Sequence, residues 1–585
     1  MGAQDANVPA KLYSTGEHTI IDDLPYTLQG IETEHHKWIE AECALLLPVL
    51  GLPLLKTAHS LAEPAILSKW LRSVVSQPPN GLVTQALFNS IDEELQQYLI
   101  FIGAVEKRVR ARTDITLSDC VVMLQQPVLA LRLLYTIVLE CQTLVGGQIM
   151  SLLHRYTRHG NQFVSSFCQR LLDKATVPFD DFLSNWVGSG TLNDPYGEFF
   201  VQVADVHSRW SGRFDFLAQL VPESMKQTDA KRAFDVGKAL YFLRSLCNDD
   251  RFIVQRESKD AKGETLINQN FNSVIEHVNN QLATKFQLSI HLQALKDYML
   301  LNKGDFVENL LRECGELLAQ PAENLVRHQL TTALETAIYT SNAQFDPPQV
   351  LKQLDARMLG LGEMAWQVFT IHYQVPSPLD VIVDERAMRT YLQIFNFLWR
   401  VRYASFALSN IWRSRIMSAR GSLKALIVEQ GIQEEWQSVV DGWQIMTQFV
   451  NELQLYIYTE VIQGAWKTMN AKLAKLATLD EIIKAHRDYL EIIKSRIMFG
   501  AGETVIELQE LLNGVLEFCR SAANMHIYIS HRQVDRQREA FTAIYDQVLQ
   551  SQAQFVSQAE KLLMKLDQDN QSFSTRLNFN SYYQL

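Results

Sequence analysis

YLQIFNFLWRVR, residues 391–402, places apolar side chains on more than one face of a helix. Leu392, Phe395 and Trp399 are spaced by three and four and form one row, while further aliphatic and aromatic residues cover much of the remaining surface. A helix that is apolar on several sides is buried rather than laid on a surface. The segment therefore predicts an inner helix of a bundle, in which its two arginines lay their aliphatic stems on apolar neighbours.

Polar residues within this segment argue against a membrane span. They are Gln393, Asn396, Arg400 and Arg402. Each charge at the centre of a bilayer costs about 2.5–3.5 kcal/mol on insertion scales. No window of the chain supplies ~20 uninterrupted apolar residues, the length that a membrane-spanning helix requires, so no membrane insertion is expected.

Helical periodicity extends from this segment over most of the chain, and 16 prolines and 26 glycines interrupt 585 residues only rarely. Apolar residues recur mostly at spacings of three to five in 82–110, 433–470, 478–498 and 531–567. Residues 127–153, PVLALRLLYTIVLECQTLVGGQIMSLL, are richer still and predict a helix covered on several sides. The predicted fold class is all-α.

The last long segment carries one apolar seam. Its members are Phe541, Ile544, Val548, Phe555, Ala559, Leu562 and Leu566. Spacings of three, four and seven place them on one face of a helix. The seam fits a helix packed on a bundle, and the alternative is a dimeric coiled coil, which needs more sustained heptads.

Few segments of the chain have the pattern of a β-strand. In QVFTIHYQVPSPLDVIV, residues 367–383, two β-rich runs flank Pro-Ser-Pro and predict a small hairpin. A boundary between two helical halves is expected near 250–290, where a charged, polar stretch interrupts the periodicity. No internal repeat of 20–50 residues is present to indicate a solenoid.

The composition narrows the class of protein. The chain is 47% hydrophobic and 20% charged, with a net charge of −11, which is typical of a globular protein without the basic surface that nucleic-acid binding needs. Its seven cysteines are odd in number and far apart, which favours a reducing compartment over a disulfide framework. The N-terminus has no apolar core typical of a signal peptide.

Sequence motifs of catalysis are absent. The chain contains neither the glycine-rich loops that bind phosphates nor the CxxC, HExxH and GxSxG patterns of metal sites and nucleophilic serines. We therefore expect no enzyme activity, no metal and no cofactor on this chain. A helical vesicle-tethering or other scaffold subunit would share this helical, acidic composition.

Residues 186–201, WVGSGTLNDPYGEFFV, read as a turn at Asn193–Pro195 anchored by aromatic residues on both sides. The stretch resembles the first motif of the gamma-tubulin complex component (Grip-motif) family, a Trp, a Gly-x-Leu and then Asp-Pro-Tyr-x-Glu-Phe-Phe. The matching residues are Trp186, Gly190, Leu192, Asp194, Pro195, Tyr196, Glu198, Phe199 and Phe200.

Other segments resemble the same family in the same order. They are DLPYTLQGIE at 23–32, GKALYFLRSLC at 237–247, KDYMLLNKGDFVEN at 296–309, SNAQFDPPQVLKQLDARML at 341–359, and YLQIFNFLWR at 391–400. The later segments most resemble component three among the family's members. Together the matches run over about 23–565, and their order and spacing make the resemblance specific.

The resemblance implies an elongated, curved stack of helical bundles in two halves. A tail, 1–22, would precede an N-terminal Grip half, 23–285, that contacts neighbouring components laterally, above all a component-two-like neighbour. A C-terminal Grip half, 286–585, would bind gamma-tubulin, and a helical ring of such units would template microtubule nucleation. GTP is expected on the bound gamma-tubulin rather than on this chain.

The resemblance also implies a place in the cell and further partners. The expected location is the cytoplasmic cytoskeleton at a microtubule-organising centre, either a centrosome or a spindle pole body. Members similar to component three carry a long N-terminal extension that binds mozart-type small proteins. Only about 22 residues precede the match in this sequence, so mozart-type partners are a conditional expectation.

Site residues are expected on irregular segments, because loops on a rigid scaffold commonly carry recognition. For gamma-tubulin the candidates are Asn342, Gln344, Phe345, Asp346, His372 and Tyr373. For the lateral contact they are Tyr196, Glu198 and Phe199. Two alternatives stay open: NAQFD at 342–346 as a turn needed only for folding, and the aromatics near 196–199 as core. Alanine at Gln344 and Asp346 is expected to weaken gamma-tubulin capture without unfolding the chain.

Overall fold

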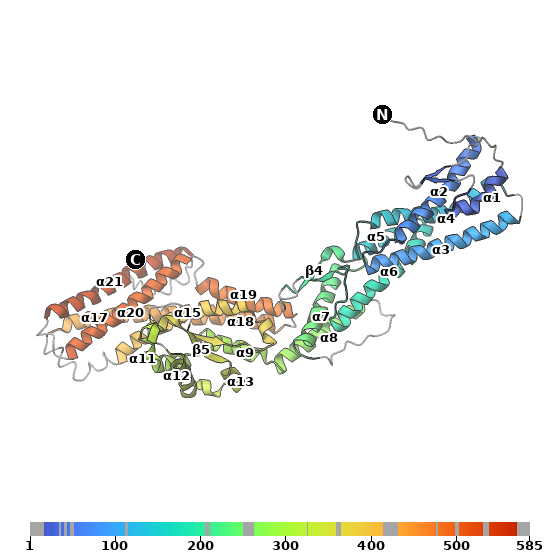
Figure 1. The fold of residues 1–585 in the computed structure, drawn as a ribbon. Coiled ribbons are helices and arrows are strands. Elements are labelled where there is room, and N and C mark those ends of the chain that lie inside the picture. The colour runs from blue at the N-terminus through green and yellow to red at the C-terminus, as the bar shows by residue number, and fades with distance from the viewer. Residues whose placement is uncertain are drawn as a thin grey trace, which may run out of the picture. The chain divides into compact units, whose positions relative to one another are not determined.

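A computed structural model of the chain is helical throughout its two compact units, Met1–Val274 and Ile275–Leu585 (Figure 1). It describes residues 17–33, 37–39, 44–46, 52–111, 115–204, 210, 212–249, 263–324, 326–358, 364–413, 427, 431–475, 478–497, 502–530 and 538–569. The division between the units falls within helix α8 (Gly263–Thr284). The predicted all-α class is confirmed, whereas the limits assigned to the two halves, 23–285 and 286–585, stay predictions.

The N-terminal unit is built mainly from long helices. Its elements are α1 (Glu17–Leu28), β1 (Lys37–Ile39), β2 (Ala44–Leu46), α2 (Leu52–Val75), α3 (Leu82–Arg110), α4 (Leu117–Cys141), α5 (Gly147–Thr157), α6 (Gln162–Ser189), β3 (Val201–Val203), β4 (Phe214–Phe216), the short 3₁₀ helix η1 (Ala218–Leu220) and α7 (Gln227–Ser245). Helix α6 packs against α3, α5 and α7, and α2 packs against α4. The core of this unit therefore lies along the apolar faces of α3 and α6.

The segment 127–153, predicted as one well-covered helix, is two helices. α4 ends at Cys141, and α5 begins at Gly147 after Gly146, whose positive φ of 51° suits only a glycine without strain. α5 is buried as predicted, but only 28% of the most apolar window of α4 is buried. Among the described residues, α4 is also the helix long and apolar enough to cross a membrane, a test that core helices of soluble proteins pass too.

The C-terminal unit surrounds one long inner helix. Its elements after α8 are α9 (Leu288–Ala294), the π-helix η2 (Leu295–Met299), α10 (Gly304–Glu313), α11 (Gly315–Leu318), η3 (Ala322–Asn324), α12 (Arg327–Thr340), η4 (Asn342–Phe345), α13 (Pro348–Leu351), β5 (Leu354–Met358), α14 (Ala365–Val368), β6 (Phe369–Tyr373), η5 (Leu379–Val381), α15 (Glu385–Ile411), α17 (Gln433–Leu455), the π-helix η8 (Tyr456–Ile462), α18 (Gln463–Leu473), α19 (Leu479–Ile497), α20 (Gly502–Ser530) and α21 (Arg538–Asp569).

Helix α15 contains the segment 391–402 and is the predicted inner helix. The Asp384 carboxylate caps its N-terminus by accepting the N–H of Ala387 at 2.8 Å. Phe395 and Trp399 are buried with their ring centroids 5.9 Å apart, and α15 packs against α17, α19 and α20. The apolar residues on several faces of the segment thus contact helices on several sides.

Arg402 joins α15 to η8, to α17 and to the segment that follows η2. Its guanidinium donates to the Tyr458 hydroxyl at 3.0 Å, to the Gln454 amide oxygen at 3.3 Å and to the Leu301 carbonyl at 3.3 Å. It also stacks 4.3 Å from the centroid of the Tyr458 ring. The guanidinium of Arg402 therefore bonds to neutral acceptors of the protein inside the bundle.

The seam of α21 packs within the chain. Phe541, Val548, Phe555 and Leu562 are buried, and α21 packs mainly against α20 and also against α17. The interpretation as a helix laid on a bundle is therefore confirmed for these positions. These side chains are therefore not available for the dimeric coiled coil that was the alternative interpretation.

The predicted hairpin within 367–383 is wrong in its second strand. FTIHY at 369–373 is β6, as the β-branched and aromatic residues indicated, but its partner is β5, which precedes it. The run LDVIV contains the 3₁₀ helix η5 instead. The antiparallel pairs β1–β2 and β3–β4 in the N-terminal unit were not predicted.

Candidate functional site

The segment after α12 forms a rigid turn that carries exposed side chains. The Ser341 hydroxyl accepts the N–H of Ala343 at 3.2 Å, which starts η4. Ala343 is buried, and the backbone N–H of Asn342 donates to the Asp305 carboxylate at 2.9 Å. These contacts fix the backbone of the turn, while the side chains of Asn342, Gln344 and Phe345 face outward.

Asp346 has a structural role in this turn. Its carboxylate accepts a hydrogen bond from the Tyr298 hydroxyl at 2.5 Å and from the Lys303 ammonium at 2.8 Å. The Tyr298 ring is fully buried, and the Lys303 side chain is only 17% exposed. Of the candidates in NAQFD, Asp346 therefore holds the turn in place, as the folding alternative proposed for the motif as a whole.

Phe345 is the most exposed aromatic residue of the turn, with 79% of its surface accessible. Tyr339, near the end of α12, is 75% exposed. Large exposed aromatic side chains on a fixed backbone are typical anchors of protein interfaces, because they bury much area at a small cost in side-chain entropy. The sequence predicted Phe345 and missed Tyr339, whose exposure no local pattern indicates.

The candidates in β6 are less accessible. Tyr373 is buried, and its hydroxyl lies 2.5 Å from Nδ1 of His291. His372 is half-buried opposite Asp355 of β5, and burial, helped by the Arg357 guanidinium, lowers the pKa of its imidazole. Tyr373 thus belongs to the core of the unit, and the two residues do not form one exposed surface with Phe345.

The N-terminal motif NDPYGEFF is a folded turn. The Asp194 carboxylate accepts the backbone N–H groups of Tyr196 at 3.2 Å, Gly197 at 2.9 Å and Phe199 at 2.8 Å. Gly197 has a φ of 71°, which a residue with a Cβ adopts only with strain. This turn explains why the sequence has Asp and Gly at these places, and it leaves Tyr196 exposed.

The Glu198 side chain caps the N-terminus of α3, a helix that is distant in the sequence. Its buried carboxylate accepts the N–H of Val83 at 2.9 Å and of Thr84 at 3.4 Å, in the first turn of α3. Burial raises the pKa of Glu198, and the N–H donors of α3 oppose that shift. A Cβ on Gly81 would lie 2.1 Å from this carboxylate, so the close approach requires glycine.

The aromatic residues of the motif form the core between α6 and α7. Phe199 is fully buried beside Phe179 and Phe182 of α6. Trp186 is fully buried against α7, where a Cβ on Gly237 would lie 2.0 Å from its ring. The Trp186 ring therefore packs directly on the backbone at Gly237, which brings two of the motif segments into contact. Glu198 and Phe199, predicted at a lateral contact, are instead inside the unit, whose exposed candidate is Tyr196.

Comparison with known families decides the identity of this fold. The family model "Gamma tubulin complex component N-terminal" matches residues 21–292, and "Gamma tubulin complex component C-terminal" matches residues 288–583. The chain belongs to the gamma-tubulin complex component family. The resemblance drawn from the motifs is thereby confirmed.

Several relatives within the gamma-tubulin complex component family are similar over most of this chain. Spindle pole body component alp6 of Schizosaccharomyces pombe is 30% identical over 97% of this chain and 77% of the relative. Gamma-tubulin complex component 3 homolog of Xenopus laevis is 28% identical over 86% of this chain and 60% of the relative. Gamma-tubulin complex component 3 of Homo sapiens is 27% identical over 86% of this chain and 59% of the relative. The chain thus spans only part of the length of each.

The sequence also missed an exposed apolar row on α4. Val122, Leu129 and Leu139 are 70%, 46% and 41% exposed. In the middle of the helix, the Arg132 guanidinium makes two hydrogen bonds to the Glu63 carboxylate of α2, at 2.5 and 2.6 Å. Val122 and Leu129, seven residues apart, share one face of α4, and Leu139 lies on the adjoining face. Exposed apolar side chains gathered along one helix can form a protein contact surface.

Proposed function

We propose that this chain is a structural, non-enzymatic subunit of a gamma-tubulin complex that takes part in microtubule nucleation at a microtubule-organising centre. The observation that carries the proposal is the succession of the two family models over almost the whole chain. Relatives named as spindle pole body and gamma-tubulin complex components support the location and the assembly.

The mechanism in this proposal is positional. The C-terminal half holds gamma-tubulin, and contacts between N-terminal halves fix the spacing of neighbouring subunits. Binding energy between subunits offsets the entropy lost in ordering the template, so tubulin adds to a preformed array rather than to a free nucleus. GTP belongs to gamma-tubulin in this scheme, consistent with the absence of a phosphate-binding loop motif from the sequence.

We place the gamma-tubulin contact on the turn at 342–346. Asp305, Ser341 and Asp346 fix its backbone, so the exposed Phe345 and Gln344 are held ready before binding. Preorganisation lowers the entropy cost of association. His372 is at most a peripheral contributor because it is half-buried, and Tyr373 supports the strand from within.

Replacing Phe345 by alanine in the full chain is expected to weaken capture of gamma-tubulin about 10- to 100-fold, the effect of removing an aromatic hot spot. Affinity is measured by interferometry with purified gamma-tubulin. Ile506→Ala, which truncates a side chain exposed by 57% on α20, is the matched control and should leave affinity unchanged. Equal affinity of the Phe345→Ala chain would move the site elsewhere.

The same measurement separates this function from its rival. A vesicle-tethering scaffold would retain no gamma-tubulin at low or moderate salt, whereas the proposed subunit retains it. Failure of the unaltered chain to capture gamma-tubulin would overturn the function itself. Failure of the Phe345→Ala variant to lose affinity would overturn only the site.

We place the lateral contact on the exposed row of α4 rather than on Glu198 and Phe199. The occupant is the N-terminal half of a neighbouring component, and a component-two-like neighbour is the proposed one. The row carries apolar side chains over several turns of α4, and its central arginine is already neutralised by Glu63. Mozart-type partners remain a separate proposal, to which no described residue is assigned.

Replacing Leu129 by glutamate is expected to weaken association with a component-two-like neighbour about 10-fold or more, because a charge at the centre of an apolar interface has to be desolvated. Sedimentation of the two purified chains measures the association. Val177→Glu, on an exposed site of α6, is the control with the same charge change. Equal loss in both variants, or in neither, would contradict the assignment.

A further inference from the structure

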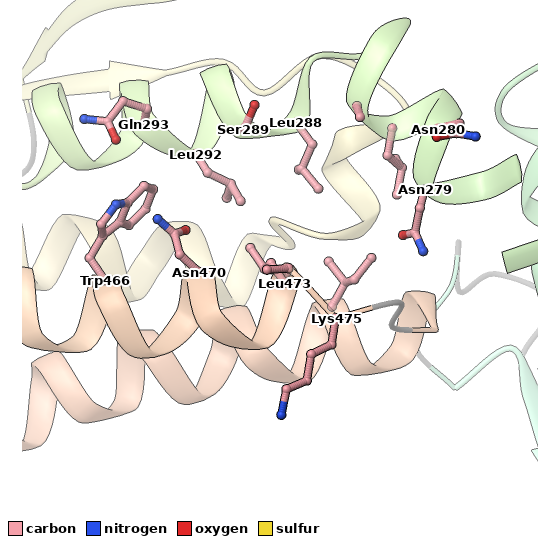
Figure 2. Close-up of a pocket in the computed structure, with 14 residues that line it drawn as sticks. Asn279, Asn280, Leu288, Ser289, Leu292, Gln293, Trp466, Asn470, Leu473 and Lys475 are labelled. Carbon is pink, nitrogen blue, oxygen red and sulfur yellow. The ribbon is translucent and has the colours of Figure 1, made fainter. Parts of the chain in front are cut away.

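A groove in the C-terminal unit lies between α9 and α18 and is closed at one end by the last turns of α8 (Figure 2). Its cavity volume is about 550 Å³, within the range of about 300–1,000 Å³ typical of ligand pockets. The residues that line it are spread along the two helices (Figure 2). Its size suits several side chains of a bound segment.

Apolar rows of two helices line the groove from both sides. Leu288 and Leu292 of α9 are four residues apart and therefore lie on one face, as do Trp466 and Leu473 of α18. Figure 2 shows the two leucines of α9 directed toward the side chains of α18. Because these rows face each other across a gap, an apolar side chain entering the groove would contact both.

Side-chain amides border these apolar rows. Gln293 and Asn470 stand beside the groove on α9 and α18, and Asn279 and Asn280 stand at its closed end (Figure 2). The Gln293 amide nitrogen already donates to the Asp297 carboxylate. The carboxamides of Asn280 and Asn470 each offer both a donor and an acceptor, the pair of groups that a peptide backbone requires. The border therefore suits a polypeptide segment better than a purely apolar molecule.

Among the described residues that line the groove, the charged side chain is Lys475. Lys475 is exposed at its border and makes no ion pair with the described residues, and no carboxylate is among the described residues that line it. A second cation lies behind the wall: the Lys296 ammonium is buried, 4.8 Å from the centroid of the Trp466 ring and 3.2 Å from the Gln463 amide oxygen. The Asp297 carboxylate lies behind the same wall, where it accepts hydrogen bonds from the Gln293 amide at 2.9 and 3.1 Å. Among the described lining residues, Lys475 is therefore the charged side chain that a negative group of an occupant can reach.

We propose that this groove binds a short segment of a partner protein that carries two apolar side chains and a carboxylate. The apolar side chains enter between α9 and α18, the amides of Asn280 and Asn470 bond to the backbone of the segment, and the carboxylate pairs with Lys475. The site is distinct from the turn at 342–346 and from the row on α4. It does not rest on the gamma-tubulin contact.

The test uses the full chain and a library of random 12-residue peptides displayed on phage. Selection on the immobilised chain should enrich peptides with two large apolar residues three or four apart and at least one Asp or Glu. The synthetic form of the most enriched peptide is then titrated by fluorescence anisotropy. Asn470→Trp fills the groove and should abolish binding. Lys475→Glu should weaken binding about 10-fold, the effect of reversing one charge-assisted contact.

Lys467→Glu is the matched control, because Lys467 is exposed on the same helix, α18, but does not line the groove. It should leave the affinity for the peptide unchanged, and both groove variants should keep full capture of gamma-tubulin. Three results would each overturn the proposal: selected peptides without a carboxylate, equal binding to the Asn470→Trp variant, or loss of gamma-tubulin capture by that variant.

Discussion

Replacing Trp186 by alanine is expected to lower the free energy of unfolding of the N-terminal unit by about 3–5 kcal/mol, the cost of removing a large buried aromatic side chain. Trp186 is fully buried and meets Phe214 edge to face, with ring centroids 5.1 Å apart. The backbone of Gly237 lies against the indole ring. Because glycine has no side chain, nothing at this position can fill the space that alanine leaves.

Hydrogen exchange followed by mass spectrometry is the suitable measurement, because the two compact units need not unfold together and exchange reports each segment separately. Peptides from α6 and α7 should lose protection in the Trp186→Ala chain, while those from α15 keep theirs. Tyr196→Ala is the control: it removes an aromatic residue of the same motif that is 56% exposed. Unchanged protection in the Trp186 variant would show that α7 is held by other contacts.

Replacing Asp346 by alanine is the second large effect, an expected loss of about 2–3 kcal/mol from the C-terminal unit. The Tyr298 hydroxyl and the Lys303 ammonium would both lose their acceptor. Hydrogen bonds to charged groups contribute about 1.5–3 kcal/mol, and an unsatisfied buried donor adds a desolvation cost. Gln344→Ala, two residues away and exposed, should change stability by less than about 0.5 kcal/mol.

Urea denaturation combined with exchange of peptides from η2 to η4 measures this difference. The result bears on the expectation that a joint Gln344 and Asp346 replacement leaves the fold intact. We now expect that double variant to loosen the turn, so reduced capture of gamma-tubulin by it would not locate the contact. Asp346→Ala with unaltered stability would contradict the structural role and restore Asp346 as a candidate contact.

The spacing of apolar residues predicted the local features of this fold, namely its helices and their buried faces. The rows of the inner helix α15 and of α21 are visible in the sequence, because burial of a helical face repeats every three or four residues. Phe395 and Val548 were assigned to packed faces on that ground and are buried. The all-α class follows from the same signal summed over the chain.

Such a pattern does not predict which elements pack together when they are distant in the sequence. The preference of FTIHY for a strand is local, but its pairing with Leu354–Met358 is not, and the wrong flanking run was chosen. The composition of α4 predicted burial on several sides, yet its apolar row is exposed, since composition does not say whether a neighbour in the same chain covers a face.

The candidate site residues show the same difference between local features, which the sequence predicted, and long-range contacts, which it did not. The motif residues Glu198 and Phe199 were recognised as a signature, but their roles depend on α3 and α6, which the motif does not contain. Phe345 was selected because it lies in an irregular segment, and its exposure agrees with that reasoning. Whether it contacts gamma-tubulin is the subject of the alanine test.

The carboxylate of Glu198 has a consequence for the order of synthesis. Helix α3 begins at Leu82, but the group that satisfies its first N–H donors is encoded 115 residues after Val83. A nascent chain on the ribosome can form α3 only with its N-terminus uncapped until α4, α5 and α6 have been translated. The N-terminal unit is therefore expected to acquire its final protease resistance late, after residue 198 has left the ribosome.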